Sequence, residues 1–127
     1  MDRNFFSKQA FAAEELKKLR ASVARSLGIS ARSREPEVKF HFAYMALIKI
    51  GIYLVARRGY RVKSRPGHHQ AIIGALAGLL KNDDVALMGD KMRRSRNMDF
   101  YGADGMITET EAAKCFEFVE AIYKNLG

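Results

Sequence analysis

The sequence of 127 residues contains one cysteine, two prolines and no tryptophan. A single cysteine, Cys115, cannot form a disulfide within the chain, which excludes an internally cross-linked extracellular scaffold and favours a reducing compartment. The first residues also lack the run of about seven or more apolar side chains that is typical of a signal peptide. We therefore expect a cytoplasmic protein.

Long hydrophobic runs are scarce as well. The most apolar stretch, residues 42–56, contains Lys49 and is shorter than the roughly 20 residues that a membrane-spanning helix needs. The sequence therefore predicts no membrane segment. Its 48% hydrophobic and 28% charged residues are ordinary for a single globular domain, which we expect to cover residues 1–127.

Acidic residues are absent between Val38 and Asn82, although the whole chain holds 14 of them against 22 Lys and Arg, a net charge of +8. The same stretch carries eight basic residues, which are Lys39, Lys49, Arg57, Arg58, Arg61, Lys63, Arg65 and Lys81. Such asymmetry favours a positive face that binds an anionic partner, such as RNA, a nucleotide or an acidic protein. The alternative is a basic bundle whose charge only keeps it in solution.

Apolar residues recur at steps of three and four along most of the chain, which predicts amphipathic helices. We expect the first helix to begin near Ala12 and to end at Gly28, followed by a polar linker over residues 30–35. Pro36 suits the first turn of a second helix, which is apolar almost all round, reaches Arg58 and ends at Gly59. Residues 60–67 read as a basic loop.

Three further helical segments follow. The third covers residues 68–81, where Gly74 and Gly78 predict a narrow side for close approach of another helix. Asp83 or Asp84 is expected to cap the fourth helix. A turn over residues 102–107 then leads to a capping box of Thr108 and Glu111, which opens the last helix. No segment alternates with the period of a strand. The fold class is therefore predicted to be all-α, an antiparallel up-and-down bundle of four to five helices.

The stretch KMRRSRNMDFYG, residues 91–102, is the most distinctive of the chain. Its arginines, Arg93, Arg94 and Arg96, could form either a phosphate-binding cluster or a solvated helix face. Asn97 could orient a phosphate or a ribose hydroxyl, or cap the end of the helix. The sequence alone leaves these alternatives open.

Taken together, several stretches resemble the HEPN family of small helical-bundle proteins, over roughly residues 8 to 126. They are ARRGYRVKS, GHHQAII, MRRSRN followed by YG, and the last helix ITETEAAKCFEFVEAIYKNL. The resemblance implies an HEPN-like dimeric bundle. Many members of that family are metal-independent ribonuclease toxins, and others are non-catalytic proteins that work beside a small nucleotidyltransferase antitoxin.

The family's catalytic motif is an arginine, usually followed by a polar residue, and a histidine after four to six intervening residues. By resemblance the arginine corresponds to Arg96, the polar residue to Asn97 and the histidine position to Tyr101. A histidine exchanges protons near pH 7, whereas a phenol with an ordinary pKa near 10 is a poor base there. We therefore expect ribonuclease activity to be weak or lost.

The other histidines are candidates for binding rather than for metal ligation. His68 and His69 are adjacent, so on a helix they point about 100° apart and cannot hold one metal in the usual geometry. Packing and capping is their default role, and an anion contact at the helix N-terminus is the alternative. His41 is expected to be a hydrogen-bonded core residue and Cys115 a small core hydrophobe. The sequence predicts no metal site and no cofactor.

The sequence thus predicts an RNA- or nucleotide-binding protein, related to the toxin component of toxin–antitoxin pairs, as a homodimer. If it is an enzyme, it is a metal-independent endoribonuclease. The anion-binding residues are predicted to be Arg93, Arg94, Arg61, Lys63, Arg65 and His68. The alternatives are a non-catalytic dimeric module that partners a small nucleotidyltransferase, and an interaction protein whose charge serves solubility alone.

Overall fold

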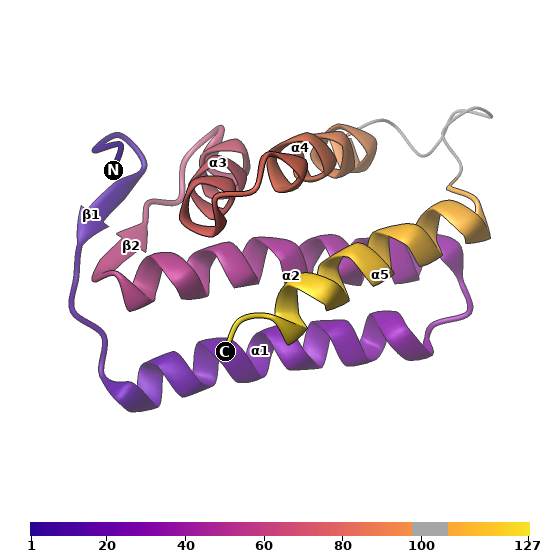
Figure 1. Ribbon diagram of the computed structural model, residues 1–127, viewed down its shortest axis with the longest axis horizontal. Coiled ribbons are helices and arrows are strands. Elements are labelled where there is room, and N and C mark those ends of the chain that lie inside the picture. Colours follow the sequence, from indigo (N-terminus) through magenta and orange to yellow (C-terminus); the bar gives the residue numbers. More distant parts are fainter. Residues whose placement is uncertain (98–106) are drawn as a thin grey trace.

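The computed structural model describes residues 1–97 and 107–127, and the predicted site residue Tyr101 and the predicted turn up to residue 106 lie outside them. Within the described residues the chain forms five helices and two short strands (Figure 1). The helices are α1 (Ala13–Arg32), α2 (Pro36–Arg57), α3 (His68–Leu80), α4 (Asp83–Asn97) and α5 (Glu109–Lys124), and the strands are β1 (Phe6–Lys8) and β2 (Tyr60–Val62). The predicted all-α bundle is confirmed.

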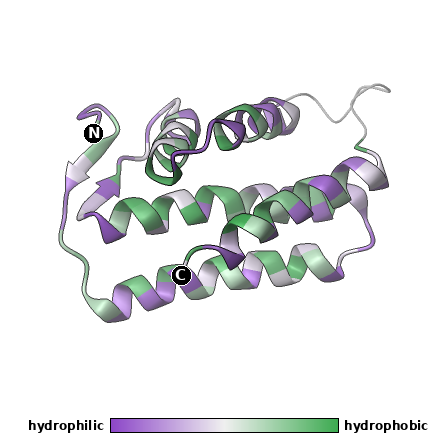
Figure 2. Ribbon diagram, in the orientation of Figure 1, coloured by the Kyte–Doolittle hydropathy of each residue, from purple (hydrophilic) through white to green (hydrophobic). Residues whose placement is uncertain are grey.

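Helix α2 is the centre of the bundle. Figure 1 shows α1 antiparallel to it on one side and α3 and α4 on the other, with α5 crossing alongside; all four helices contact it. Figure 2 shows α2 as hydrophobic over most of its length, whereas hydrophobic and hydrophilic turns alternate along α1. A helix that is apolar on most sides is stable only when neighbours cover it, which is the role that α2 was predicted to have.

The core consists of the apolar side chains that α2 shares with its neighbours. Its largest fully buried members are Tyr44, Phe40, Leu47, Ile50, Ile72, Leu76, Met92, Val23, Val55, Val85 and Val119. Each such side chain stabilises the fold by about 1.5–3 kcal/mol relative to leaving it in water. Cys115 is buried among them, as predicted for a core residue, and burial raises the pKa of its thiol.

At 22 residues α2 is longer than the apolar stretch in the sequence, and by length and composition it could cross a membrane. However, more than half of its most apolar window is buried inside the bundle. The lysine within the apolar stretch also has a partner in the fold, because Lys49 Nζ donates to the Ser26 hydroxyl over 2.8 Å. The helix therefore packs as the core helix of a bundle does.

Several predicted helix boundaries agree with the structure. Pro36 is the first residue of α2, and Gly59, just after its end, has the positive φ of 83° that only glycine adopts easily. The capping box of α5 is formed, since Thr108 Oγ1 accepts from the Glu111 N–H over 3.1 Å and the Glu111 carboxylate accepts from the Thr108 N–H.

The predicted end of α1 at Gly28 is wrong, because the helix continues through Gly28 to Arg32. The extra turn is held from α2: the Ser30 hydroxyl donates to the Lys39 carbonyl, and Lys39 Nζ donates to the Ser30 carbonyl. A glycine permits a helix end but does not require one, and this tertiary contact decides the outcome. The residue that caps α4 also differs from the prediction. Asp83 or Asp84 was expected, but Asn82 Oδ1 accepts from the Asp84 N–H over 2.9 Å.

The segment predicted as a basic loop, residues 60–67, begins instead with a strand. β2 pairs antiparallel with β1, with Phe6 opposite Val62 and Lys8 opposite Tyr60. Strands of three residues are too short to show a periodicity of two, so the sequence pattern could not reveal them. This two-stranded sheet holds the N-terminal segment beside the start of α3 (Figure 1).

The glycines that allow close helix packing are also different from those predicted. A Cβ atom added at Gly74 or Gly78 would meet nothing within 4 Å, so these residues form no narrow contact. At Gly51, in contrast, an added Cβ would collide with the Ile72 side chain, and at Gly89 it would lie 2.7 Å from Cγ2 of Ile73. Helix α3 is thus packed against glycines of α2 and α4.

We expect Gly51→Ala to lower the free energy of unfolding by about 1–3 kcal/mol, because the new methyl group overlaps the β-branched Ile72, which has little freedom to move. The matched control is Gly74→Ala, which should raise it by about 0.5–1 kcal/mol, since alanine favours a helix and the space is open. Urea unfolding followed by circular dichroism measures both. Equal effects of the two substitutions would contradict the packing described.

Candidate functional site

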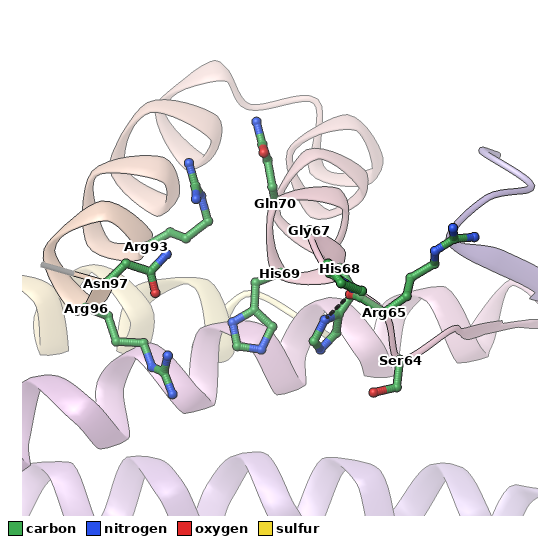
Figure 3. Close-up of a pocket in the computed structure, with 10 residues that line it drawn as sticks. Ser64, Arg65, Gly67, His68, His69, Gln70, Arg93, Arg96 and Asn97 are labelled. Atoms are coloured by element: carbon green, nitrogen blue, oxygen red, sulfur yellow. Dashed lines mark hydrogen bonds between the residues drawn. The ribbon is translucent and has the colours of Figure 1, made fainter.

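A basic cleft of about 490 Å³ lies between the start of α3, the loop before it and the end of α4 (Figure 3). Its lining residues are Ser64, Arg65, Pro66, Gly67, His68, His69, Gln70, Arg93, Arg96 and Asn97. Three arginines and two histidines are among them, and none of these lining residues is acidic. The volume is within the range of about 300–1,000 Å³ that is typical of ligand sites.

The N-terminal segment holds the loop that forms one wall of the cleft. The Lys63 N–H donates to the Phe5 carbonyl over 2.7 Å, which extends the contact between β1 and β2 toward α3. The Arg65 guanidinium donates to the Asn4 carbonyl over 2.9 Å and lies over the Phe5 ring, 5.7 Å from its centroid. The small sheet therefore positions Arg65, which is 61 positions away from Asn4 in the sequence.

Helix α3 begins at the cleft, where the His68 N–H donates to the Arg65 carbonyl over 3.0 Å and no side chain caps the N–H groups that follow in the first turn. Gly67, the residue before its first turn, has a φ of 85° and no side chain that could cap the helix. The first N–H groups of a helix have no partner within it, and together with the helix dipole they favour a nearby anion. The bend at Pro66 and Gly67 thus directs the positive end of α3 into the cleft.

The two histidines of α3 are held by different partners. His68 Nδ1 lies 2.8 Å from the Arg65 carbonyl oxygen, and because a carbonyl only accepts, this nitrogen carries a hydrogen. His69 Nδ1 lies 2.9 Å from the hydroxyl of Tyr44, which is fully buried in α2. The two imidazole rings are neighbours, with centroids 4.5 Å apart. Each ring is therefore fixed through Nδ1 and keeps Nε2 for another partner.

On the opposite wall, Asp90 binds two of the α4 arginines. Its carboxylate oxygens lie 2.9 Å from Arg93 Nη2 and 2.8 Å from Arg94 Nη2, and the hydrogen bond to Arg93 chiefly lowers the pKa of Asp90. Arg94 points toward Asp90 and does not line the cleft. Asp90 was not identified from the sequence, although its spacing of three and four residues from the arginines is that of helix ion pairs.

Arg96 connects the two walls through Tyr44. Its guanidinium lies 5.9 Å from the centroid of the Tyr44 ring, whose hydroxyl contacts His69. Burial raises the pKa of Tyr44 to about 12, so this phenol stays protonated. Burial lowers the pKa of His69, and the positive charges of His68, Arg96 and Arg93 lower it further. The cleft therefore holds a neutral imidazole beside fixed cations at pH 7.

The structure brings together five of the residues predicted for the site, Arg65, His68, Arg93, Arg96 and Asn97. Of the other predicted residues that the structure describes, none lines this cleft. Arg61 is exposed in β2, Lys63 donates to the Arg3 carbonyl on the other side of the sheet, and Arg94 pairs with Asp90. Tyr101 lies outside the described residues. Sequence reasoning missed Tyr44 as a support for the site, because a buried tyrosine in an apolar helix resembles any other core residue.

His41 was predicted as a core residue, and this is wrong. It is exposed on α2, with its ring edge-on to Phe42 at a centroid distance of 5.1 Å. Local desolvation and the charge of Arg96 lower its pKa. The neighbours of α2 do not bury this position, so the apolar pattern alone assigned the residue to the wrong environment. Within the described residues, no group of three or more His, Cys, Asp or Glu side chains comes together that could hold a metal ion.

Comparisons of the chain with protein-family models, with curated proteins and with solved structures find no match. The HEPN resemblance therefore rests on the motifs in the sequence, and the function has to be argued from the cleft itself.

We expect Arg96→Ala to raise the pKa of both His41 and His69, because it removes a positive charge that disfavours the imidazolium form of each ring. Titration of the histidine ring protons by NMR measures the two values. Arg94→Ala is the matched control, since its guanidinium is directed to Asp90, and it should leave both pKa values nearly unchanged. A decrease in either pKa on loss of Arg96 would contradict this electrostatic description.

Proposed function

We propose that the basic cleft binds the phosphate groups of RNA or of a nucleotide. The observation that carries the proposal is the convergence of Arg65, Arg93 and Arg96, from two distant parts of the chain, on one cleft with no acid among the described residues that line it. Like charges repel, so a cluster of this kind is stable and useful chiefly with an anionic ligand. Phosphate fits it well, because guanidinium groups present paired donors to its oxygens.

Polar groups around the arginines extend the same proposal. The N–H groups of the first turn of α3 after His68, which no side chain caps, add donors for a phosphate. Ser64, Gln70 and Asn97 line the same cleft and offer neutral donors and acceptors for a ribose or a base edge. A ligand that combines a phosphate with a sugar and a base therefore matches the cleft better than an inorganic anion does.

In cellular terms, the sequence resemblance supports a toxin-like RNA-binding component, or an accessory subunit beside a small nucleotidyltransferase. The two assignments share the anion-binding cleft and differ in whether RNA is cut. A gene for a small nucleotidyltransferase next to the gene for this chain would support both over a protein whose charge serves only solubility.

We expect the wild-type chain to bind a fluorescently labelled single-stranded RNA at low salt, with a dissociation constant that rises steeply with salt, because the release of counterions from the RNA is less favourable at higher salt. Arg96→Ala should weaken binding by about 10- to 100-fold, because a hydrogen bond to a charged group contributes about 1.5–3 kcal/mol. Fluorescence anisotropy measures the binding, and competition with a mononucleotide shows whether one nucleotide fills the cleft.

The control for this measurement is Arg25→Ala, which removes an exposed arginine from α1 on the other side of the bundle. It changes the net charge equally and should alter the affinity far less. If the two substitutions weaken RNA binding to the same extent, the charge of the whole protein rather than the cleft is responsible.

The homodimer is also a proposal, which the family resemblance supports. Sedimentation equilibrium at tens of micromolar is expected to give twice the mass of one chain. A single-chain mass at that concentration would overturn the dimer and leave the cleft proposal intact, since the described residues of a single chain already form the cleft.

A further inference from the structure

A second basic cavity, of about 630 Å³, lies beside the small sheet and outside the cleft described above. The side chains that give it its character are those of Arg3, Ser7, Lys8, Tyr60 and Lys63. Three of these are cations, and no acid is among the described residues that line the cavity. The cavity therefore has the same charge as the cleft, although it is built from different residues.

The two cavities meet at one point of the chain. Lys63 lines the second cavity, and the next two residues, Ser64 and Arg65, line the cleft. Lys63 Nζ donates to the Arg3 carbonyl over 2.9 Å. The Arg65 guanidinium, at the end of the cleft nearest the small sheet (Figure 3), donates to the next carbonyl, that of Asn4, over 2.9 Å. The N-terminal segment thus holds a cation of each cavity on consecutive carbonyls, and the positive charge continues from one to the other.

The second cavity has hydrogen-bond donors that the described part of the protein does not use. An ammonium group carries three hydrogens, and Lys63 places one of them on the Arg3 carbonyl. Arg3 and Lys8 are exposed, and neither forms an ion pair within the described residues. The nearest acid in the sequence, Asp2, accepts instead from the Asn4 N–H over 2.8 Å. These cations are therefore available to an anionic ligand.

We propose that an RNA strand bound in the cleft continues into this second cavity, where Arg3, Lys8 and Lys63 bind a neighbouring phosphate of the same strand. The inference rests on the proposed function, since it requires a strand in the cleft. It narrows the ligand from RNA or a nucleotide to a single-stranded RNA of several nucleotides, because a single nucleotide fills one cavity only.

A single strand suits a surface of this kind. Proteins bind single-stranded nucleic acids with a positive groove that follows the backbone and with aromatic side chains on which bases stack. Tyr60 is half-buried in the wall of the second cavity and places an aromatic ring beside the three cations. The inference also gives a role to Lys63, a predicted anion-binding residue that does not line the cleft.

The first test follows the backbone amide signals of the full chain by NMR during titration with two RNAs at low salt. One is a dinucleotide and the other is a single strand of about 16 nucleotides, which is at the upper end of the usual length of single-strand sites. We expect both RNAs to shift the signals of His68 and Arg96 in the cleft. Only the longer RNA should also shift those of Lys8 and Tyr60.

The second test measures the affinity of a variant for the same two RNAs. Arg3→Gln combined with Lys8→Gln should weaken binding of the longer RNA by about 10- to 100-fold at low salt, and should leave binding of the dinucleotide nearly unchanged. The slope of log K against log salt should also become smaller by about 1.4, because each phosphate contact to a single strand contributes about 0.7. The Arg3 carbonyl that holds Lys63 is a backbone group, so the variant retains it.

Two control variants accompany this measurement. Lys18→Gln combined with Arg25→Gln removes two exposed cations of α1 that line neither cavity, and it should alter both affinities far less. Arg3→Lys combined with Lys8→Arg keeps both charges and should bind the longer RNA nearly as wild type does. Thermal unfolding by circular dichroism shows whether each variant is folded.

The outcomes distinguish this inference from the proposed function. A longer RNA that shifts the cleft signals but not those of Lys8 and Tyr60 overturns the inference and leaves the binding proposal standing. No binding of RNA or nucleotide at low salt overturns both. Equal weakening by the α1 control assigns the effect to the charge of the whole protein and overturns the inference. So does an acidic peptide, oligoglutamate, that shifts the signals of Lys8 and Tyr60 more than RNA does at equal charge.

Discussion

The apolar surface of α2 has to be covered on nearly every side, and this constraint organises the whole molecule. Helix α1 covers one side and α3, α4 and α5 cover much of the rest. The closeness of α3 depends on Gly51, where any side chain would collide with Ile72. Because α3 lies so near, the buried hydroxyl of Tyr44 reaches His69 at its first turn. The packing of the core thus orients a side chain in the cleft.

Two sets of contacts shape the cleft, one between segments distant in sequence and one within α4. The pairing of β1 with β2 brings Asn4 and Phe5 to Arg65 and so shapes the loop before α3. On the facing wall, one carboxylate, Asp90, orders Arg93 and directs Arg94 away. The result is a positive cleft that is lined by three arginines and by neutral polar side chains.

Much of the fold could be predicted from the sequence, because the spacing and end signals of a helix lie within the segment that forms it. The steps of three and four predicted the helices, Pro36 and Gly59 marked the limits of α2, and the Thr108–Glu111 box marked the start of α5. The errors occurred where a distant contact decides the outcome. The last turn of α1 depends on Lys39 of α2, and the strand at Tyr60–Val62 exists only because residues 6–8 pair with it. Local periodicity contains neither contact.

For the site, the sequence by itself determined its chemistry: an excess of positive charge without acids between residues 38 and 82, two histidines at a helix start, and arginines at the end of another helix. Only the tertiary structure decided which of these groups meet. It placed Arg65 and His68 beside Arg93 and Arg96, turned Lys63 and Arg94 elsewhere, exposed His41 and supplied Tyr44 from the core. The physical reason is that charge and residue type are local properties, whereas convergence depends on how the whole core packs around α2.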